Sequence, residues 1–284
     1  MFETLLISAI SMGVIGAVLA GFLVFADKKL KVEEDPRIEA LAATLPNTNC
    51  GGCGYPGCRM FAEALLKGEA PPTACVAGGN ETAAQLASLL GVEAGSVKRM
   101  LAVVLCKGGN AEAVRSASYK GEMTCTAEHL TGGGKGCTYG CLGLGECVDA
   151  CKFDAMAMNA DGLPVVFYDK CVGCGACARA CPRYIIEMHP EDHKLFVYCR
   201  SRDKGAYAKK VCSVACIACG LCVKDCSVPG GIALKDNLAV VNYAAAPQND
   251  ESIKRCPTKC ILYDVEEGTT RDAYLSSLPK GRGR

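Results

Sequence analysis

Cysteine restricts the folding of this chain more than any other residue, because 22 of its 284 residues are cysteine. Most of these cysteines lie within six residues of another one. Thiols at this density indicate either a disulfide framework or bound metal, and the choice between them depends on the redox compartment. The N-terminal segment reports on that compartment.

Residues 5–26 contain no charged side chain and predict a transmembrane helix. Such a helix is about 33 Å long, enough to cross a hydrocarbon core of about 30 Å. Lys28, Lys29 and Lys31 follow it, which by the positive-inside rule places the N-terminus outside the cell and the rest of the chain in the reducing cytosol. A cleaved signal peptide is the alternative, but it would have a basic start and a shorter apolar run. Metal ligation is therefore favoured over disulfides.

The charge balance and the glycine-rich runs bear on other functions. The chain has 31 Lys and Arg residues against 30 Asp and Glu residues, which does not indicate a nucleic acid partner. The glycine-rich run at 132–136 lacks the strand, helix and downstream acidic residue of a dinucleotide fold. The uncharged span lacks the buried ionisable groups of an ion path. We therefore expect nucleotide chemistry and ion conduction to reside in other proteins.

From residue 137 onward the chain contains an internal repeat with an offset of 75 residues. LPVVFY at 163–168 recurs as LAVVNY at 238–243, and four cysteines recur in the same order: Cys137, Cys141, Cys147 and Cys151 become Cys212, Cys216, Cys222 and Cys226. The next four cysteines are mostly lost, since Cys171, Cys174, Cys177 and Cys181 fall on Ala246, Asn249, Ser252 and Cys256. The repeat predicts duplication of one folded unit, with a degenerate second copy.

The segment CVGCGACARACP, which begins at Cys171, has the spacing of a cubane iron-sulfur site. In two-cluster bacterial ferredoxins the fourth cysteine of such a run binds the other cluster. Crossed ligation predicts two sites in the first repeat: one of Cys151, Cys171, Cys174 and Cys177, and one of Cys137, Cys141, Cys147 and Cys181. Structural zinc is the alternative, since four-cysteine zinc sites also use C-x2-C pairs, although usually as two separated pairs.

Two further sites bring the expected number of [4Fe-4S] clusters to four. In the second repeat, Cys216, Cys219 and Cys222 are completed by the crossed ligand Cys256, and Cys226 is left as a small buried hydrophobe. The N-terminal set is Cys50, Cys53, Cys58 and Cys75, where zinc competes more strongly. Five cysteines stay unassigned, and a fifth cluster drawing on some of them is left open: Cys106, Cys125, Cys199, Cys212 and Cys260.

The expected fold is α+β, with a single N-terminal transmembrane helix, a small α-helical iron-sulfur domain and two tandem ferredoxin-like modules, the second degenerate. Asp35 and Pro36 predict a helix start, and further helices are expected at 59–67, 81–91 and 96–105. The expected domains are an anchor at 1–27, a four-cysteine iron-sulfur domain at 28–80, a helical and glycine-rich connecting region at 81–130, a two-cluster module at 131–198 and a one-cluster module at 199–284.

After the anchor, the chain carries four cysteine motifs in order: CGGCGYPGC, KGCTYGCLGLGECVDACKFDAM, DGLPVVFYDKCVGCGACARACPR and CIACGLC. This order resembles that of the B subunit of the Rnf complex over nearly the whole chain. Residues 50–75 also resemble the cluster-binding domain of corrinoid iron-sulfur proteins. The Rnf resemblance implies an electron-transfer subunit of a complex in the cell (inner) membrane that oxidises reduced ferredoxin, reduces NAD and exports Na+ or H+. Ferredoxin would deliver electrons to this subunit, with the NAD site and ion path on other subunits.

Two other functions stay open. A membrane-anchored polyferredoxin would serve a hydrogenase or a corrinoid-protein reductase, and a zinc-binding scaffold would bind proteins without moving electrons. The segment 199–210 holds five cations against Asp203 and would either attract an acidic ferredoxin or form a solvated loop or subunit contact: Arg200, Arg202, Lys204, Lys209 and Lys210. The three histidines show no ligand spacing and are expected at the surface.

Overall fold

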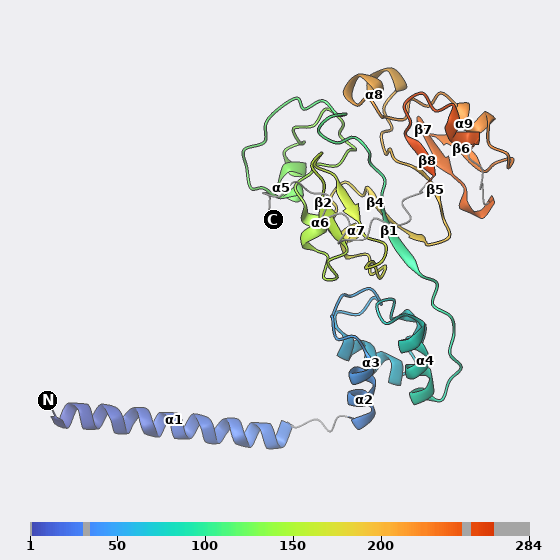
Figure 1. Cartoon of the computed structure of the whole chain (residues 1–284). Coiled ribbons are helices and arrows are strands. Elements are labelled where there is room, and N and C mark those ends of the chain that lie inside the picture. Colours follow the sequence, from blue (N-terminus) through green and yellow to red (C-terminus); the bar gives the residue numbers. More distant parts are fainter. Residues whose placement is uncertain (1, 31–34, 246–250, 264–284) are drawn as a thin grey trace.

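The computed structural model describes residues 2–30, 35–245 and 251–263. It begins with the helix α1, Phe2–Leu30, which stands apart from the rest of the described chain in Figure 1. Within α1, the 24 residues Leu6–Lys29 form the one helix of the described chain that is long and apolar enough to cross a membrane. Its large apolar side chains from Leu6 to Phe25 are exposed, and this span is not buried against the rest of the described chain. The helix therefore fits membrane anchoring.

The next part of the chain is helical. The helix α2, Pro36–Thr44, begins at Asp35, whose side chain accepts a hydrogen bond from the N–H of Arg37. The helix α3, Cys58–Leu66, and the helix α4, Gly79–Leu90, flank the 3-10 turn η1, Pro72–Ala74. Apolar side chains of these helices form one core, which includes Leu41, Phe61 and Leu86. The helices expected at 59–67 and 81–91 are present as α3 and α4.

Residues 100–190 form a unit that we call the first segment. The strand β1, Met100–Val104, pairs antiparallel with β4, Ile186–Pro190, and the strand β2, Met156–Met158, pairs with β3, Pro164–Val166. Three short helices lie between the strands: α5, Cys125–Leu130; α6, Glu146–Asp149; and α7, Ala176–Ala180.

The prediction of a helix at 96–105 is wrong, because Met100–Val104 is the strand β1. The stretch is only five residues long, and its central residues Leu101, Ala102 and Val103 are all buried. A short apolar run of this kind does not distinguish a buried strand from a helix, and pairing with β4 decides the outcome. The strand also makes residues 100–104, which the sequence assigned to a connecting region, part of the first segment.

Residues 195–263 form the second segment, which repeats this order of elements. The strand β5, Leu195–Val197, pairs with β8, Ile261–Tyr263, and β6, Ile232–Lys235, pairs with β7, Leu238–Val241. Its helices are α8, Gly205–Val211; α9, Leu221–Lys224; η2, Tyr243–Ala245; and α10, Glu251–Lys254. Ala246 and Asn249, two of the positions expected to have lost their ligands, lie outside the described residues, and Ser252 lies in α10.

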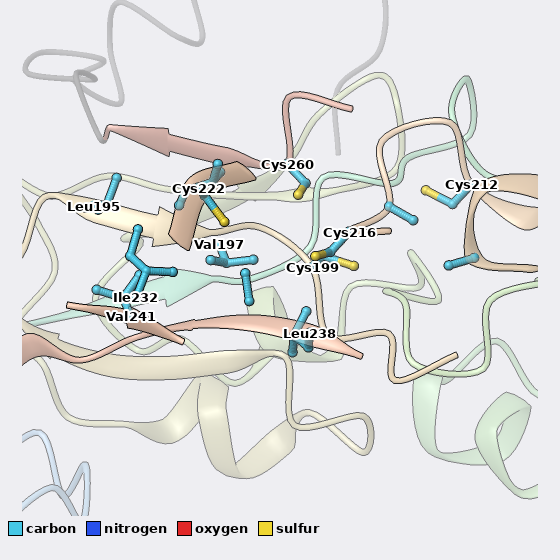
Figure 2. Packing of buried hydrophobic residues seen from close by; sticks show 14 of the residues in the cluster. Leu195, Val197, Cys199, Cys212, Cys216, Cys222, Ile232, Leu238, Val241 and Cys260 are labelled. Atoms are coloured by element: carbon cyan, nitrogen blue, oxygen red, sulfur yellow. The ribbon is translucent and has the colours of Figure 1, made fainter. Parts of the chain in front are cut away.

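Cysteine side chains make up part of each hydrophobic core. Figure 2 shows the core of the second segment, where Leu195, Ile232 and Val241 pack beside Cys199, Cys216 and Cys222. The core of the first segment likewise includes Cys141, Cys147 and Cys177 beside Met156 and Ile185. Units this small cannot bury a large apolar core, and bound metal commonly supplies the missing stability.

A smaller apolar cluster joins the two segments. Val103 and Leu105 of the first segment pack against Phe196 of the second, with Tyr198 and Tyr243 beside them. His189, expected at the surface, is buried here, with its ring centroid 5.0 Å from that of Phe196. The expectation failed because β4 turns this residue toward the joint between the segments.

Candidate metal centres

Three of the short helices carry a cysteine in the same local structure. Gly145, Gly175 and Gly220 are the N-cap residues of α6, α7 and α9, and each has a left-handed backbone, with φ of 85°, 71° and 73°. Glycine adopts this conformation without steric cost. A cysteine follows two residues later in each helix, at Cys147, Cys177 and Cys222. The repeated turn therefore places one thiol of each loop in an equivalent position.

The structure brings together the four cysteines of one predicted set. Cys151, Cys171, Cys174 and Cys177 line a cavity with an open volume of about 330 Å³, which we call site 1. Met100 of β1 approaches so closely that a Cβ on Gly173 would lie 2.5 Å from its carbonyl oxygen. Glycine at this position therefore allows the cysteine loop to pack against the sheet.

The second predicted set of the first segment differs at one position. Cys141, Cys147 and Cys181 line a cavity of about 370 Å³, site 2, together with Cys125 in place of Cys137. Cys125 is the first residue of α5, which begins after the N-cap residue Thr124. Glu146 at the start of α6 accepts a hydrogen bond of 2.8 Å from the N–H of Thr126, and this contact holds α5 against α6.

Sequence reasoning missed Cys125 because it lies outside the 75-residue repeat, in a region read as irregular. The sequence signal at this position was local: Thr124, directly before Cys125, is a residue type that favours the N-cap of a helix. Cys137 instead lines a different cavity, which has an open volume of about 330 Å³ and also receives Cys106, Cys199 and Cys212.

The predicted set of the second segment also comes together. Cys216, Cys219, Cys222 and Cys256 line a cavity of about 340 Å³, site 3. Cys260 lines the same cavity, with its sulfur 3.8 Å from that of Cys256. Cys226 lies at none of these cavities and directs its thiol toward the carbonyl oxygen of Val228, 3.4 Å away.

The N-terminal set is brought together on turns before and after α3. The side-chain oxygen of Asn49 accepts a hydrogen bond of 2.8 Å from the N–H of Cys58, which fixes the start of α3 beside the cysteine loop. Burial raises the pKa of the Cys75 thiol, and the neighbouring Cys53, Cys50 and Cys58 raise it further. We call Cys50, Cys53, Cys58 and Cys75 the N-terminal site.

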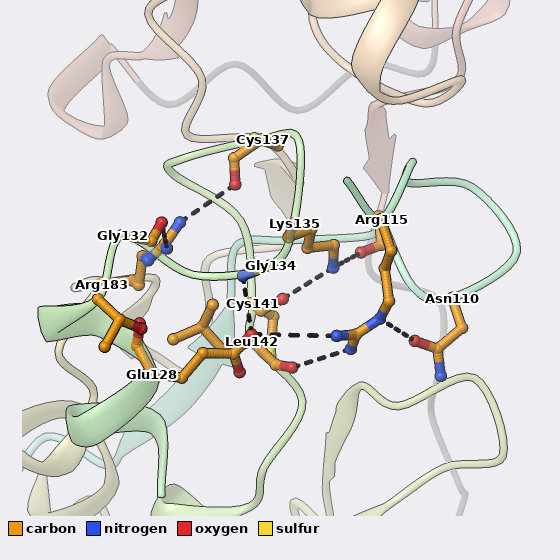
Figure 3. Close-up of polar contacts among 12 residues, drawn as sticks. Asn110, Arg115, Glu128, Gly132, Gly134, Lys135, Cys137, Cys141, Leu142 and Arg183 are labelled. Carbon is orange, nitrogen blue, oxygen red and sulfur yellow. Dashed lines mark hydrogen bonds and ion pairs between the residues drawn. The ribbon is translucent and has the colours of Figure 1, made fainter. Parts of the chain in front are cut away.

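Cationic side chains hold the loops that carry these cysteines. Arg183 donates to the carbonyl oxygens of Cys137 and Thr138, and Lys135 donates to that of Cys141, as Figure 3 shows for Cys137 and Cys141. Arg179 bridges two sites by donating to the carbonyl oxygens of Cys174 and Cys50, at 3.1 and 3.3 Å. Positive charge therefore lies beside the cysteine loops of the N-terminal site and of the first segment, which favours an anionic occupant there.

The donor sets fit iron-sulfur clusters better than single zinc ions. Zinc holds its sulfur ligands about 2.3 Å away, so the sulfurs of a zinc site lie about 3.8 Å apart. Among the described residues no group of three or more Cys, His, Asp or Glu side chains converges closely enough for one metal ion. Sites 1 to 3 are instead separate cavities, each lined by at least four cysteines.

The buried thiols need a cation in order to ionise. Burial raises the pKa of Cys141 to about 12, of Cys177 to about 12 and of Cys222 to about 11. Iron ligands are thiolates, so binding of cationic iron releases these protons. The all-thiolate donor sets, with cations nearby, are those of iron-sulfur proteins.

Comparison with known families agrees with this chemistry. A family of Fe-S cluster domains matches residues 45–77, which include the N-terminal site. The 4Fe-4S binding domain family matches residues 164–187, which include three cysteines of site 1 and Cys181 of site 2. Iron-sulfur domains are therefore present in two parts of the chain.

Three curated relatives align with most of the chain. The B subunit of the Na+-translocating ferredoxin:NAD+ oxidoreductase complex of Acetobacterium woodii is 42% identical over 276 residues, or 97% of this chain and 82% of the relative. The B subunit of the ion-translocating oxidoreductase complex of Methanosarcina acetivorans is 39% identical and covers 86% of this chain and 96% of the relative. The B subunit of the proton-translocating ferredoxin:NAD+ oxidoreductase complex of Clostridium ljungdahlii is 39% identical over 97% of this chain and 100% of the relative.

Identity at this level extends over the apolar helix, the N-terminal site and both cysteine-rich segments, and the resemblance of the motifs to Rnf proteins is confirmed. The chain belongs to the B-subunit family of the Rnf, or ion-translocating ferredoxin:NAD+ oxidoreductase, complexes.

Proposed function

We propose that this chain is the electron-transfer subunit of a membrane complex that oxidises reduced ferredoxin and passes electrons toward NAD, with coupled translocation of Na+ or H+. Its relatives bear the names of such complexes. The NAD site and the ion path lie on other subunits. The helix α1 anchors the chain with its N-terminus outside the cell and the cysteine-rich parts on the cytoplasmic side.

We propose four ligand sets for [4Fe-4S] clusters, in an α-helical iron-sulfur domain and two tandem ferredoxin-like units. They are the N-terminal site, site 1, site 3 and site 2, with Cys125 in the place that the sequence assigned to Cys137. Each cluster, when bound, accepts and releases one electron, and the protein supplies ligands, burial and nearby positive charge.

The series of contacts between the sites carries the proposal. Arg179 links the N-terminal site to site 1 through Cys50 and Cys174, and a Cβ on Gly52 would lie 3.0 Å from the Cα of Cys174. Site 1 adjoins site 2, because Cys147 lies in α6 and Cys151 follows two residues after its end, and the charge of Cys177 acts on Cys147. Closely spaced redox centres in a row form a path for electrons, which a set of isolated zinc sites would not require.

Electron transfer by the anaerobically purified complex tests this function. Mixing with reduced ferredoxin should bleach the chain's visible absorption and then reduce NAD. A Cys174→Ala variant, which interrupts the series at site 1, should reduce NAD more than tenfold more slowly, whereas Cys226→Ala should leave the rate unchanged. Wild-type NAD reduction in the Cys174→Ala complex would contradict the proposed path.

The subunits that co-purify distinguish the Rnf function from that of a polyferredoxin serving a hydrogenase or a corrinoid-protein reductase. A colourless chain that contains zinc would instead identify a scaffold. The basic segment 199–210 gives limited support to ferredoxin docking, because Arg200 pairs with Glu187 and Arg202 lies 3.7 Å from Asp236.

A further inference from the structure

Four cysteines outside the four ligand sets meet at one place. Cys106, Cys137, Cys199 and Cys212 line the cavity of about 330 Å³ described above, which we call the joint site. Cys137, Cys199 and Cys212 are buried, and Cys106 is half-buried. The lining contains Lys135 and Arg200 but no Asp, Glu or His side chain. The four thiols are therefore the metal-ligating groups of this cavity.

The two segments contribute equivalent residues to the joint site. Cys106 lies two residues after the end of β1, and Cys199 lies two residues after the end of β5. Cys137 and Cys212 are related by the 75-residue repeat. The N–H of Lys107 donates a hydrogen bond of 3.2 Å to the carbonyl oxygen of Tyr198. The backbone segments that follow β1 and β5 therefore run side by side. The cavity is thus built from both copies of the repeat.

Close backbone packing holds the thiols around the cavity. Residues Ala113 and Cys212 form an antiparallel bridge, and the N–H of Ser213 donates to the carbonyl oxygen of Glu112 at 2.9 Å. A Cβ on Gly108 would lie 2.8 Å from the sulfur of Cys212. Glycine at 108 therefore leaves room for that sulfur, which any side chain would displace.

A buried cation makes the joint site suited to an anionic group. Lys135 is 6% exposed, and its ammonium group donates to the carbonyl oxygens of Gly108 and Cys141. Within the described part of the chain it has no carboxylate partner. A buried ammonium group is costly unless negative charge compensates it. Four thiolates around an iron-sulfur cube carry net negative charge and supply that compensation.

We propose that Cys106, Cys137, Cys199 and Cys212 bind a fifth [4Fe-4S] cluster at the joint between the two segments. Each thiol loses its proton and forms one bond to iron, so four Fe–S bonds replace four S–H bonds. Like sites 1 to 3, the joint site is a cavity lined by at least four cysteines.

The joint site also lies between sites 2 and 3. The N–H of Cys141, a ligand of site 2, donates a hydrogen bond of 3.4 Å to the sulfur of Cys106. Cys199 packs in the same buried cluster as Cys216, a ligand of site 3. An electron received from one neighbouring site leaves to the other, with no net change at the joint site. This relay role rests on the proposed electron-transfer function, whereas cluster binding does not.

Iron and sulfide counting on the anaerobically purified full-length chain tests the proposal. The wild-type chain should contain about 20 irons, five cubes of four, rather than about 16. A Cys212→Ala variant should lose about four irons and four sulfides together with one electron paramagnetic resonance signal. The matched control is Cys226→Ala, whose thiol lines none of the cavities described above and which should keep the wild-type count.

Three results would overturn the proposal: about 16 irons in the wild-type chain, an unchanged count in Cys212→Ala, or zinc in place of the missing iron. The iron content of the wild-type chain still tests the proposal if Cys212→Ala fails to fold. Cys106→Ser, a substitution at a half-buried position, provides a second variant. Failure of the electron-transfer function would give a different result. The chain would still contain about 20 irons, but reduced ferredoxin would leave the clusters oxidised.

Discussion

The first and second segments share an order of strands and helices, and on the proposed ligand sets they differ in how many ligands they retain. In the first segment, Cys147 of α6 lines site 2, and Cys151, two residues after the end of α6, lines site 1, so one short stretch of chain serves two sites. In the second segment, α9 carries Cys222 for site 3, while Cys226 packs against the apolar core and donates its thiol hydrogen bond to the carbonyl oxygen of Val228.

A crossed site takes three ligands from one loop and the fourth from another loop. The second segment shows these two contributions separately. The second copy has lost three cysteines of one loop but keeps Cys256, the residue that reaches across to site 3. On the proposed ligand sets, a ligand is therefore retained where it serves the neighbouring site. The predictions below use equivalent positions of the two copies.

Removal of the metal should have the largest effect. Structural zinc sites contribute about 10–16 kcal/mol, as much as or more than the whole stability of a typical domain, and we expect cluster binding to be linked to folding in the same way. Anaerobic treatment with a strong iron chelator should therefore abolish hydrogen-exchange protection of β2 and β3 in the first segment. The second segment, with its larger apolar core of Leu195, Ile232 and Ile261, should lose protection later. Unchanged protection of both segments after complete loss of iron would contradict this order.

Paired substitutions should reveal which cysteines share a site. A Cys125→Ala, Cys147→Ala variant removes two ligands of site 2 and should lose about four irons. A Cys125→Ala, Cys137→Ala variant affects two sites and should lose about eight. The original assignment of Cys137 to site 2 would be restored if Cys137→Ala with Cys147→Ala lost only about four irons.

Single substitutions at equivalent positions should sharpen the comparison. Cys151→Ala removes a ligand of site 1, and about four irons should be lost. Cys226→Ala, 75 residues later, should leave the iron content and the electron paramagnetic resonance spectrum unchanged. Loss of iron from both variants would contradict this comparison. It would show that Cys226 is a ligand of a further site near α9, whose cysteines the structure does not bring together.

The smallest effect should come from Cys260, a residue with no thiol counterpart in the first segment. The repeat places Ile185 at the equivalent position, where it lines site 2. Hydrogen bonding between Cys260 and the sulfurs of Cys216 and Cys256 lowers the pKa of both and raises that of Cys260.

A Cys260 thiol that donates to ligand sulfurs stabilises the reduced, more negative cluster. Cys260→Ala should therefore keep all the iron and shift the midpoint potential of site 3 to a lower value in a redox titration. Loss of about four irons in this variant would instead make Cys260 a ligand.

The sequence predicted the parts of the molecule that depend on local pattern. The apolar span, the start of α2 at Asp35 and the loop of Cys171, Cys174 and Cys177 each follow from neighbouring residues, and the structure contains all three. The crossed position of Cys256 followed from the repeat. Such features need no knowledge of how distant parts of the chain pack.

The features that were missed depend on tertiary contacts. The strand β1 exists because β4 pairs with it, and Cys125 reaches site 2 because Glu146 holds α5 against α6. The joint site needs both copies of the repeat to face each other, and no spacing between Cys106 and Cys199 reveals this. His189 is buried for the same reason, since the apolar cluster around it is formed by both segments.

Electron paramagnetic resonance of the full-length, anaerobically purified chain after mixing with reduced ferredoxin tests the central claim most directly. We predict signals of several reduced [4Fe-4S] clusters with magnetic coupling between neighbours, accounting for most of the iron in the sample. A chain that held little iron, or iron that ferredoxin left unreduced, would contradict the account.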